Sequence, residues 1–188
     1  MKKAIIFVCA VIGLSSSAQA IGLRFGAFFG IRTLNDSALK DIYGQGTVLY
    51  PYLSVELGKG FGIGVSYELY NRSGTVKPYS ESTQLKINGK EIFLSYTFYL
   101  GTIRPYIHAG FGSYSYNQTI VSDYLAGYSV NAKSSGLHFA GGVVFTILKP
   151  VQVSVEAKYV PLNVHPFEDK VDLGGWRFSA GLGLAFEI

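Results

Sequence analysis

The stretch from Gly175 to Ile188 alternates two kinds of residue without a break. One parity carries mainly large apolar residues, namely Trp176, Phe178, Ala180, Leu182, Leu184, Phe186 and Ile188. The other carries small or charged residues, namely Arg177, Ser179, Gly181, Gly183, Ala185 and Glu187. A period of two over this length indicates a β-strand with one apolar face. The stretch is also long enough to cross a bilayer as a tilted strand, which takes about 9–11 residues.

The same alternation recurs along the chain and predicts eight strands. They are expected at Ile21–Thr33, Thr47–Gly58, Phe61–Arg72, Glu91–Leu100, Arg104–Tyr116, Gly136–Leu148, Val151–Val160 and Gly175–Ile188. Tight turns at 58–60, near Gly101 and at 149–150 alternate with longer polar segments at 34–46, 73–90, 117–135 and 161–174. Short turns on one rim and long loops on the other are typical of membrane barrels. The sequence therefore predicts an all-β fold, an eight-stranded antiparallel up-and-down transmembrane β-barrel with both ends on the periplasmic rim.

The N-terminus has the three parts of a secretory signal peptide. Lys2 and Lys3 precede an apolar run from Ala4 to Leu14, and Ala18-Gln19-Ala20 fits the small-x-small cleavage rule. We therefore expect residues 1–20 to be a cleaved signal and residues 21–188 to form one barrel domain. The only cysteine, Cys9, lies inside the predicted signal, so no disulfide is expected in the mature protein.

Charge and motifs exclude several classes of function. The chain has 16 Lys+Arg and 12 Asp+Glu, and removing Lys2 and Lys3 leaves 14 against 12. This near balance argues against a nucleic-acid partner. The sequence contains no metal-binding cluster, phosphate loop or nucleotide fingerprint, so no cofactor is expected.

The glycines indicate which face of the barrel points outward. Nine strand glycines share the polar parity: Gly22, Gly26, Gly30, Gly62, Gly64, Gly110, Gly112, Gly181 and Gly183. An eight-stranded barrel is barely wide enough for its interior side chains, so large residues there need small neighbours. The polar parity is therefore expected inside and the apolar parity against lipid, as in a membrane barrel and unlike a soluble lipocalin-like one. Tyr67, Tyr96, Tyr159 and Trp176 are expected in the interfacial aromatic girdles.

The inward parity predicts a polar network inside the barrel. Its expected members are Arg24, Arg32, Glu56, Glu68, Arg72, Glu91, Arg104, His108, His138, Glu156, Lys158, Arg177 and Glu187. Buried ions of this kind must pair and hydrogen-bond. The network is interpreted either as a packed plug or as a path for solutes or protons, and the plug is favoured because only larger barrels leave an aqueous channel.

The histidines do not fit the catalytic motif of the outer-membrane lipid-A deacylases, in which Ser-Asn follows the histidine. His108 is followed by Ala109, His138 by Phe139 and His165 by Pro166. We therefore expect no enzyme activity and no catalytic residues, and a lipid-A-modifying enzyme is the most distant alternative.

Two segments carry a family resemblance. Arg104-Pro105-Tyr106-Ile107 leads into Ala109-Gly110-Phe111-Gly112, and the chain finishes with Gly181-Leu182-Gly183-Leu184-Ala185-Phe186-Glu187-Ile188. The chain resembles the small outer-membrane β-barrel family that includes OmpX and the barrel half of OmpA. The resemblance implies a place in the outer membrane of a Gram-negative bacterium, in contact with lipid and lipopolysaccharide. It also implies that the barrel-assembly machinery recognises the C-terminal strand.

These observations lead to an expected role. The barrel is interpreted as a rigid structural anchor that presents four extracellular loops for surface interaction, with a narrow porin-like pore for ions or small solutes as the alternative. An extracellular ligand could bind through the loops. Four tyrosines near the third loop, Tyr114, Tyr116, Tyr124 and Tyr128, are interpreted either as a binding patch or as part of the girdle and hairpin above the membrane.

Overall fold

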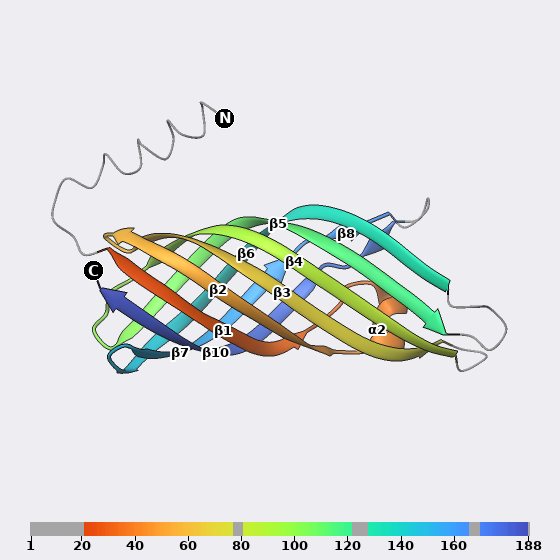
Figure 1. Ribbon diagram of the computed structural model, residues 1–188, viewed down its shortest axis with the longest axis horizontal. Helices are drawn as coiled ribbons and strands as arrows, with labels where there is room; N and C mark the ends of the chain where they lie inside the picture. Colours follow the sequence, from red (N-terminus) through yellow and green to blue (C-terminus); the bar gives the residue numbers. More distant parts are fainter. Residues whose placement is uncertain (1–20, 77–80, 122–127, 166–169, 188) are drawn as a thin grey trace, which may run out of the picture.

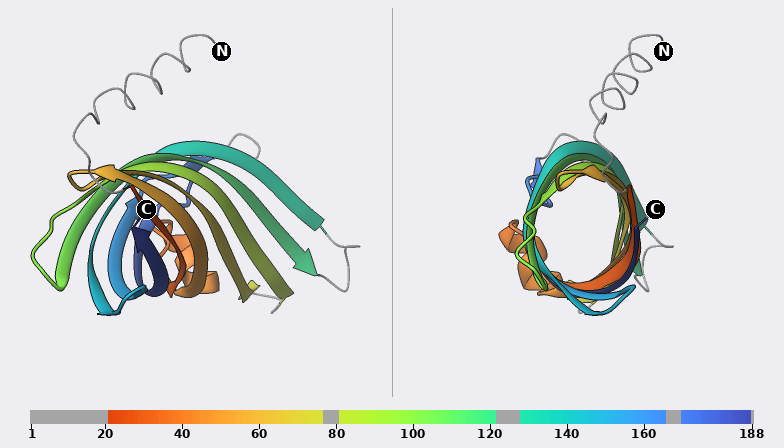
Figure 2. Two further views of the ribbon diagram at one scale, coloured as in Figure 1. Left: turned by 60° about the vertical axis from the view of Figure 1, so that its left-hand side comes forward. Right: turned by 90° about the vertical axis from the view of Figure 1, so that its left-hand side faces the viewer.

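Eight long strands close into one antiparallel barrel in the computed structural model, which describes residues 21–76, 81–121, 128–165 and 170–187. The strands are β1 (Gly22–Arg32), β2 (Gly46–Gly58), β3 (Phe61–Val76), β4 (Glu81–Thr97), β5 (Ile103–Val121), β6 (Tyr128–Leu148), β7 (Val151–Val160) and β10 (Gly175–Glu187). Each pairs with its neighbours along the chain, and β1 closes the ring against β10 (Figures 1 and 2). The predicted eight-stranded up-and-down barrel is confirmed.

The alternation places apolar side chains on the outside of the barrel and polar ones inside. On β10, Leu182 is 65% exposed, whereas the inward-facing Arg177 is 0% exposed. Similarly exposed large apolar residues occur on all eight strands of the ring. A continuous apolar surface of this extent is typical of a lipid-facing belt, because soluble monomers expose only small apolar patches. The predicted orientation is confirmed.

Interior glycines make room for aromatic rings of neighbouring strands. A Cβ atom built on Gly181 would lie 2.7 Å from the ring of Phe28, and one built on Gly110 would lie 2.7 Å from the ring of His138. Real Cβ atoms do not approach other atoms this closely, so a larger residue would displace the ring. The glycines therefore allow bulky side chains to fill the bore.

Four strands are longer than predicted. Residues 73–90 and 117–135 were expected to be loops, but most of their described residues extend β3, β4, β5 and β6. These strands rise beyond the other four as a curved sheet (Figure 2). The prediction was wrong because the apolar parity reverses above the belt: Leu85 and Ile87 point inward and are fully buried, while Lys86 points outward.

The outer connections fold over the inner face of this sheet. The segment 34–46, expected to be a loop, contains the helix α2 (Ser37–Tyr43), which begins where the Asp36 carboxylate accepts a hydrogen bond from the Leu39 amide at 3.0 Å. Between β7 and β10, a small pair forms from β8 (Asn163–Val164) and β9 (Val171–Asp172). Figure 1 shows α2 beside the outer ends of the strands.

Buried apolar residues from these connections and from the strands form a core at the outer end of the bore. The members of this outer core include Leu34, Leu39, Tyr43, Val48, Tyr70, Leu85, Ile87, Tyr116, Val160, Leu162, Val164 and Leu173. Two backbone hydrogen bonds tie the connections together, from Asn35 N to Gly174 O at 2.9 Å and from Asp36 N to Asp172 O at 3.1 Å. The outer end of the barrel is thus covered by packed chain.

Within the described residues, no helix has the length and apolar character needed to cross a bilayer. The predicted signal segment, residues 1–20, and Ile188 lie outside the described residues.

Candidate functional site

An ion-paired network crosses the middle of the bore. It consists of Arg32, Glu68, Glu91, Lys158 and Arg177, which come from β1, β3, β4, β7 and β10. None of these residues is more than 4% exposed. Because charges in such surroundings are costly unless paired, the strands are held in one register by these contacts.

Two carboxylates organise this central network. Glu91 forms ion pairs with Lys158 and, at 3.2 Å, with Arg177, and it accepts hydrogen bonds from Ser66 Oγ at 2.6 Å and Tyr114 Oη at 2.7 Å. Each Glu91 oxygen therefore has two partners.

Glu68 is shared between two arginines. Arg32 Nη1 lies 2.5 Å from Glu68 Oε1, and Arg177 pairs with the other Glu68 oxygen. Arg32 also donates from Nη2 to Leu173 O at 2.7 Å, which joins the network to the outer connection that follows β9.

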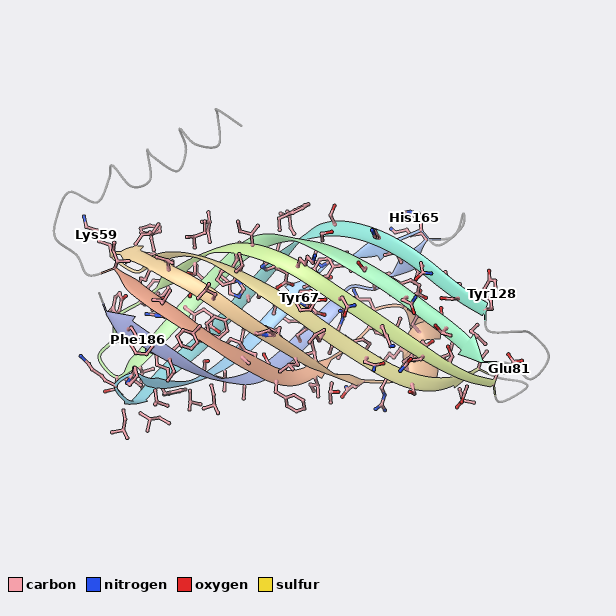
Figure 3. The ribbon with its side chains drawn as sticks, in the orientation of Figure 1. Lys59, Tyr67, Glu81, Tyr128, His165 and Phe186 are labelled. Carbon is pink, nitrogen blue, oxygen red and sulfur yellow. The ribbon has the colours of Figure 1, made fainter. Side chains whose placement is uncertain are left out.

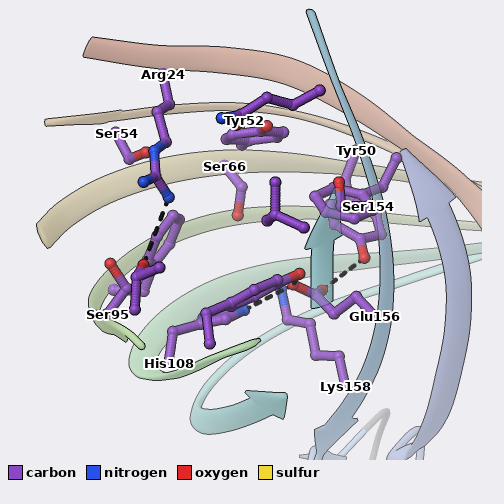
Figure 4. A pocket seen from close by; sticks show the side chains of 16 residues that line it. Arg24, Tyr50, Tyr52, Ser54, Ser66, Ser95, His108, Ser154, Glu156 and Lys158 are labelled. Carbon is purple, nitrogen blue, oxygen red and sulfur yellow. Dashed lines mark hydrogen bonds and ion pairs between the residues drawn. The ribbon is translucent and has the colours of Figure 1, made fainter. Parts of the chain in front are cut away.

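A third carboxylate, Glu156, lies in a smaller cluster closer to the turn end. It accepts hydrogen bonds from Tyr50 Oη at 2.6 Å and from Tyr106 Oη at 2.7 Å, and His108 Nε2 lies 3.1 Å from its Oε2. This cluster lines an interior cavity of about 60 Å³, shown with its surrounding side chains in Figure 4. The cavity has room for only a few waters.

The second interior histidine, His138, is fully buried, and neither of its ring nitrogens has a hydrogen-bond partner among the described residues. Its ring meets that of His108 edge-on, with the ring centroids 5.5 Å apart. The two histidines therefore lie together, but only His108 joins the carboxylate cluster.

The turn end of the bore is open. A mouth cavity of about 660 Å³ is lined by both charged and aromatic residues, including Arg24, Glu56, Lys59, Tyr99 and Arg104. Arg24 forms an ion pair with Glu56, and the guanidinium of Arg104 lies over the Tyr99 ring, 5.2 Å from its centroid. Two residues, Arg24 and Gln152, line both the mouth and the interior cavity beside Glu156.

At the outer end, Tyr43 of α2 fastens the helix to the strands. Its hydroxyl lies 2.7 Å from Thr83 Oγ1 and accepts a hydrogen bond from Gln118 Nε2 at 2.9 Å. Burial raises the pKa of the Tyr43 hydroxyl above its ordinary value, so this side chain stays neutral at physiological pH. Arg72 Nε donates to the Tyr43 carbonyl at 3.1 Å.

Two residues of the predicted interior network lie elsewhere or are not described. Arg72 is exposed at the outer end, because β3 has already risen beyond β2 at this point, so its expected place inside the bore was wrong. The side chain of Glu187 lies outside the described part of the chain.

Tyr114 and Tyr116 were interpreted either as part of a binding patch or as part of the girdle and the hairpin above the membrane. Both lie on the β5–β6 hairpin, and the binding patch is wrong for these two residues. Both are buried inside, since they share the inward parity of β5 with His108. Tyr124 lies outside the described residues, and Tyr128 is exposed at the start of β6. Sequence reasoning also missed the hydroxyl partners Tyr50, Tyr106 and Ser66, although their inward parity on the predicted strands was a usable signal.

The central network and the Glu156 cluster fill the bore and hold their charged groups in pairs. The central network and Glu156 together contain three cations and three carboxylates, so their formal charges balance. Among the described residues, no group of three or more histidine, cysteine or acidic side chains could hold a metal ion.

Comparisons with known proteins identify the same fold. No protein-family model matches the chain, and no curated protein sequence matches it either. Among solved structures, it is similar to the outer membrane protein OprG from Pseudomonas aeruginosa, with a TM-score of 0.72 and 14% identity over 90% of this chain and 98% of that one.

Two other structures show the same likeness. Neisserial surface protein A gives a TM-score of 0.63 and 16% identity over 88% of this chain and 97% of that one. The attachment invasion locus protein Ail of Yersinia pestis was solved in complex with the heparin analogue sucrose octasulfate. It gives a TM-score of 0.59 and 13% identity over 89% of this chain and 99% of that one.

The chain therefore has the fold of the small eight-stranded outer-membrane β-barrels. Together with the exposed apolar belt, this fold places the protein in the outer membrane. The tight turns between β2 and β3 and between β6 and β7 correspond to the periplasmic rim, and the extended ends of β3 to β6 to the cell surface.

Proposed function

We propose that this protein is a non-conducting structural barrel that anchors a rigid, extended sheet at the cell surface for contact with other molecules. The observation that carries the proposal is the filled bore. The central network lies across the barrel with all five side chains buried, and the outer core covers it on the extracellular side. An ion entering from the periplasmic mouth would have to displace paired charges and packed apolar side chains.

A surface role is supported by the shape of the outer end. The ends of β3 to β6 project beyond the rest of the barrel and remain paired as a continuous sheet (Figure 3, between Tyr67 and Tyr128). A paired sheet holds its outward side chains in fixed positions, whereas a loop would not. The projecting sheet is therefore well suited to present a defined surface.

The proposal includes the absence of catalysis. A nucleophilic site needs a serine or cysteine within hydrogen-bond reach of a base that a third group orients. In the described chain, His108 has its one polar contact with Glu156, and His138 has none. The histidines thus lack the hydroxyl partner that acyl-transfer chemistry requires.

A narrow pore is the second candidate, and the open mouth favours it. The 660 Å³ mouth cavity and the interior cavity beside Glu156 and Lys158 share Arg24 and Gln152 in their linings. Movement of a few side chains beyond that point would be needed for conduction.

Single-channel recording in planar bilayers separates the two candidates. Purified, refolded barrel is expected to give no steady unitary conductance in 1 M KCl, roughly the salt at which surface electrostatics are screened. A general porin recorded under the same conditions confirms that the bilayer would report a pore.

Reproducible unitary steps would favour the pore, provided that they arise from this bore. The matched check is Arg24→Gln, which changes a charge in the mouth without touching the central network. If the cation-to-anion selectivity of the steps shifts in this variant, the bore conducts and the proposal is overturned. Steps that do not change come from a contaminating porin and leave the expected absence of conductance standing.

A further inference from the structure

We propose that the outward face of β4 and β6, just above the apolar belt, binds the phosphate groups of the outer-leaflet glycolipid. The proposed site consists of Lys86, Lys90 and Lys133, called here the lysine patch. It is independent of whether the bore conducts.

The strand register fixes the position of the patch relative to the belt. Val65, Ile92, Phe111 and Leu137 pair in one row across β3 to β6, and all four are between 50 and 56% exposed. The next row outward consists of Tyr67, Lys90, Ser113 and Ser135. Lys90 therefore lies directly beside the last fully apolar row, where hydrocarbon gives way to headgroups.

The other two lysines follow in the next two rows. Lys133 pairs with Ser115, which pairs with Asn88, and Lys86 pairs with Asn71 and Asn117. With strands about 4.8 Å apart and a rise of about 3.4 Å per residue, each lysine Cα lies about 12–14 Å from the other two. Long, flexible lysine side chains can converge over such a distance on one or two phosphate groups.

Among the residues that the structure describes, the surroundings of the patch are polar and carry no negative charge. All three lysines are exposed, and none has an ion-pair partner among the described residues. The neighbouring outward positions on these strands are Asn71, Ser73, Thr75, Ser82, Gln84, Asn88, Ser113, Ser115, Asn117, Thr119, Ser129, Asn131 and Ser135, so no carboxylate competes for the lysines.

The position of the lysine patch directly beside the apolar belt indicates which molecule binds there. A molecule that contacts Ile92 and Phe111 through acyl chains must place its headgroup over Lys90, and the lipid on this side of the membrane is the outer-leaflet glycolipid. Each lysine near such a charged surface adds attraction, and hydroxyl and amide neighbours can hydrogen-bond sugar or phosphate oxygens. The arrangement thus matches a phosphorylated amphiphile better than a free polyanion, which would not need the apolar row.

Titration of the purified barrel in neutral detergent tests the proposal. Lipopolysaccharide with phosphorylated lipid A is added to the wild type and to Lys86→Gln/Lys90→Gln/Lys133→Gln, and affinity is measured by native mass spectrometry at physiological salt. The triple variant is expected to bind at least about tenfold more weakly, because each lysine near a lipid surface contributes to binding. The wild type is expected to bind lipid A without phosphate about as weakly as the triple variant binds the phosphorylated form.

The matched control removes the same charge elsewhere. Lys40→Gln/Lys59→Gln/Lys170→Gln changes three exposed lysines outside the patch and should keep wild-type affinity. Heat-dependent gel mobility reports whether each variant is folded, and Lys90→Gln alone replaces the triple variant if that one fails to fold. The proposal would be overturned if the patch variant bound lipopolysaccharide as tightly as the wild type, or if the control variant lost as much affinity as the patch variant. It would also be overturned if the wild type bound dephosphorylated lipid A or phosphatidylglycerol as tightly as phosphorylated lipopolysaccharide.

Discussion

Replacing Glu91 with glutamine should lower the free energy of unfolding by about 3–5 kcal/mol, the usual cost of leaving a buried ion without its partner. Glu91 binds Lys158 and Arg177 with its two oxygens and also accepts from Ser66 and Tyr114. The amide keeps the shape of the side chain, but it removes the negative charge and turns its NH2 donor toward one of the two cations. Urea unfolding in lipid vesicles, followed by Trp176 fluorescence, measures the loss.

A second substitution separates charge from packing. Glu91→Gln/Lys158→Gln restores the balance of charges inside the bore, so the double variant should be more stable than Glu91→Gln alone. The expected coupling between the two positions is about 1–3 kcal/mol, as found for residues in contact.

The control is Asp41→Asn, which neutralises an exposed carboxylate on α2 and should change stability by less than about 0.5 kcal/mol. If Glu91→Gln costs no more than Asp41→Asn, the central network does not hold the barrel together.

Replacing Leu182 with arginine should cost about 2–4 kcal/mol, the penalty measured for a cation on the lipid face near the bilayer midplane. Leu182 lies on the outward face of β10, between Val153 of β7 and Ala27 of β1. Equilibrium unfolding in vesicles gives the value.

The same substitution closer to the periplasmic rim should be milder. Phe186 shares the outward face of β10 with Leu182 and lies four residues nearer to the rim, where the cost of a charge falls to about 0–1 kcal/mol. The loss of the stacking contact between Phe186 and Phe25, whose ring centroids are 6.0 Å apart, adds to that value. Equal costs at both positions would contradict a lipid-facing belt, because a soluble core has no such dependence on depth.

The sequence predicted the barrel because the period of two is continuous where one face meets lipid. Glycine on the polar parity then indicated which face points inward, as at Gly181 beside Phe28. The lengths of β4, β5 and β6 could not be predicted this way. Above the belt the outside is polar and the inside apolar, so Leu85 and Ile87 do not continue the apolar parity of Ile92 and Leu94.

For the interior site, parity predicted which residues point inward but not which of them form ion pairs with one another. Arg177 meets Glu68 and Glu91 across the bore, and that contact depends on the stagger of strands that are not neighbours in the ring. The same limit explains Tyr114: parity placed it on the inward face of the predicted strand, but its partner Glu91 on β4 could not be predicted. The outer core could not be predicted from the sequence either, because the buried face of α2 is defined only by its contacts with the sheet that it covers.

Fluorescence quenching of Trp176 by brominated lipid tests most directly whether the apolar face meets acyl chains. Trp176 is the only tryptophan of the chain, and it lies on the outward face of β10 beside Tyr159 and Phe178. In vesicles of the folded barrel, bromine on shallow acyl carbons should quench its emission strongly, and bromine on deep carbons less so, as befits a girdle residue. Emission that no brominated lipid quenches, from protein that is folded and stays in solution without detergent, would contradict the membrane barrel.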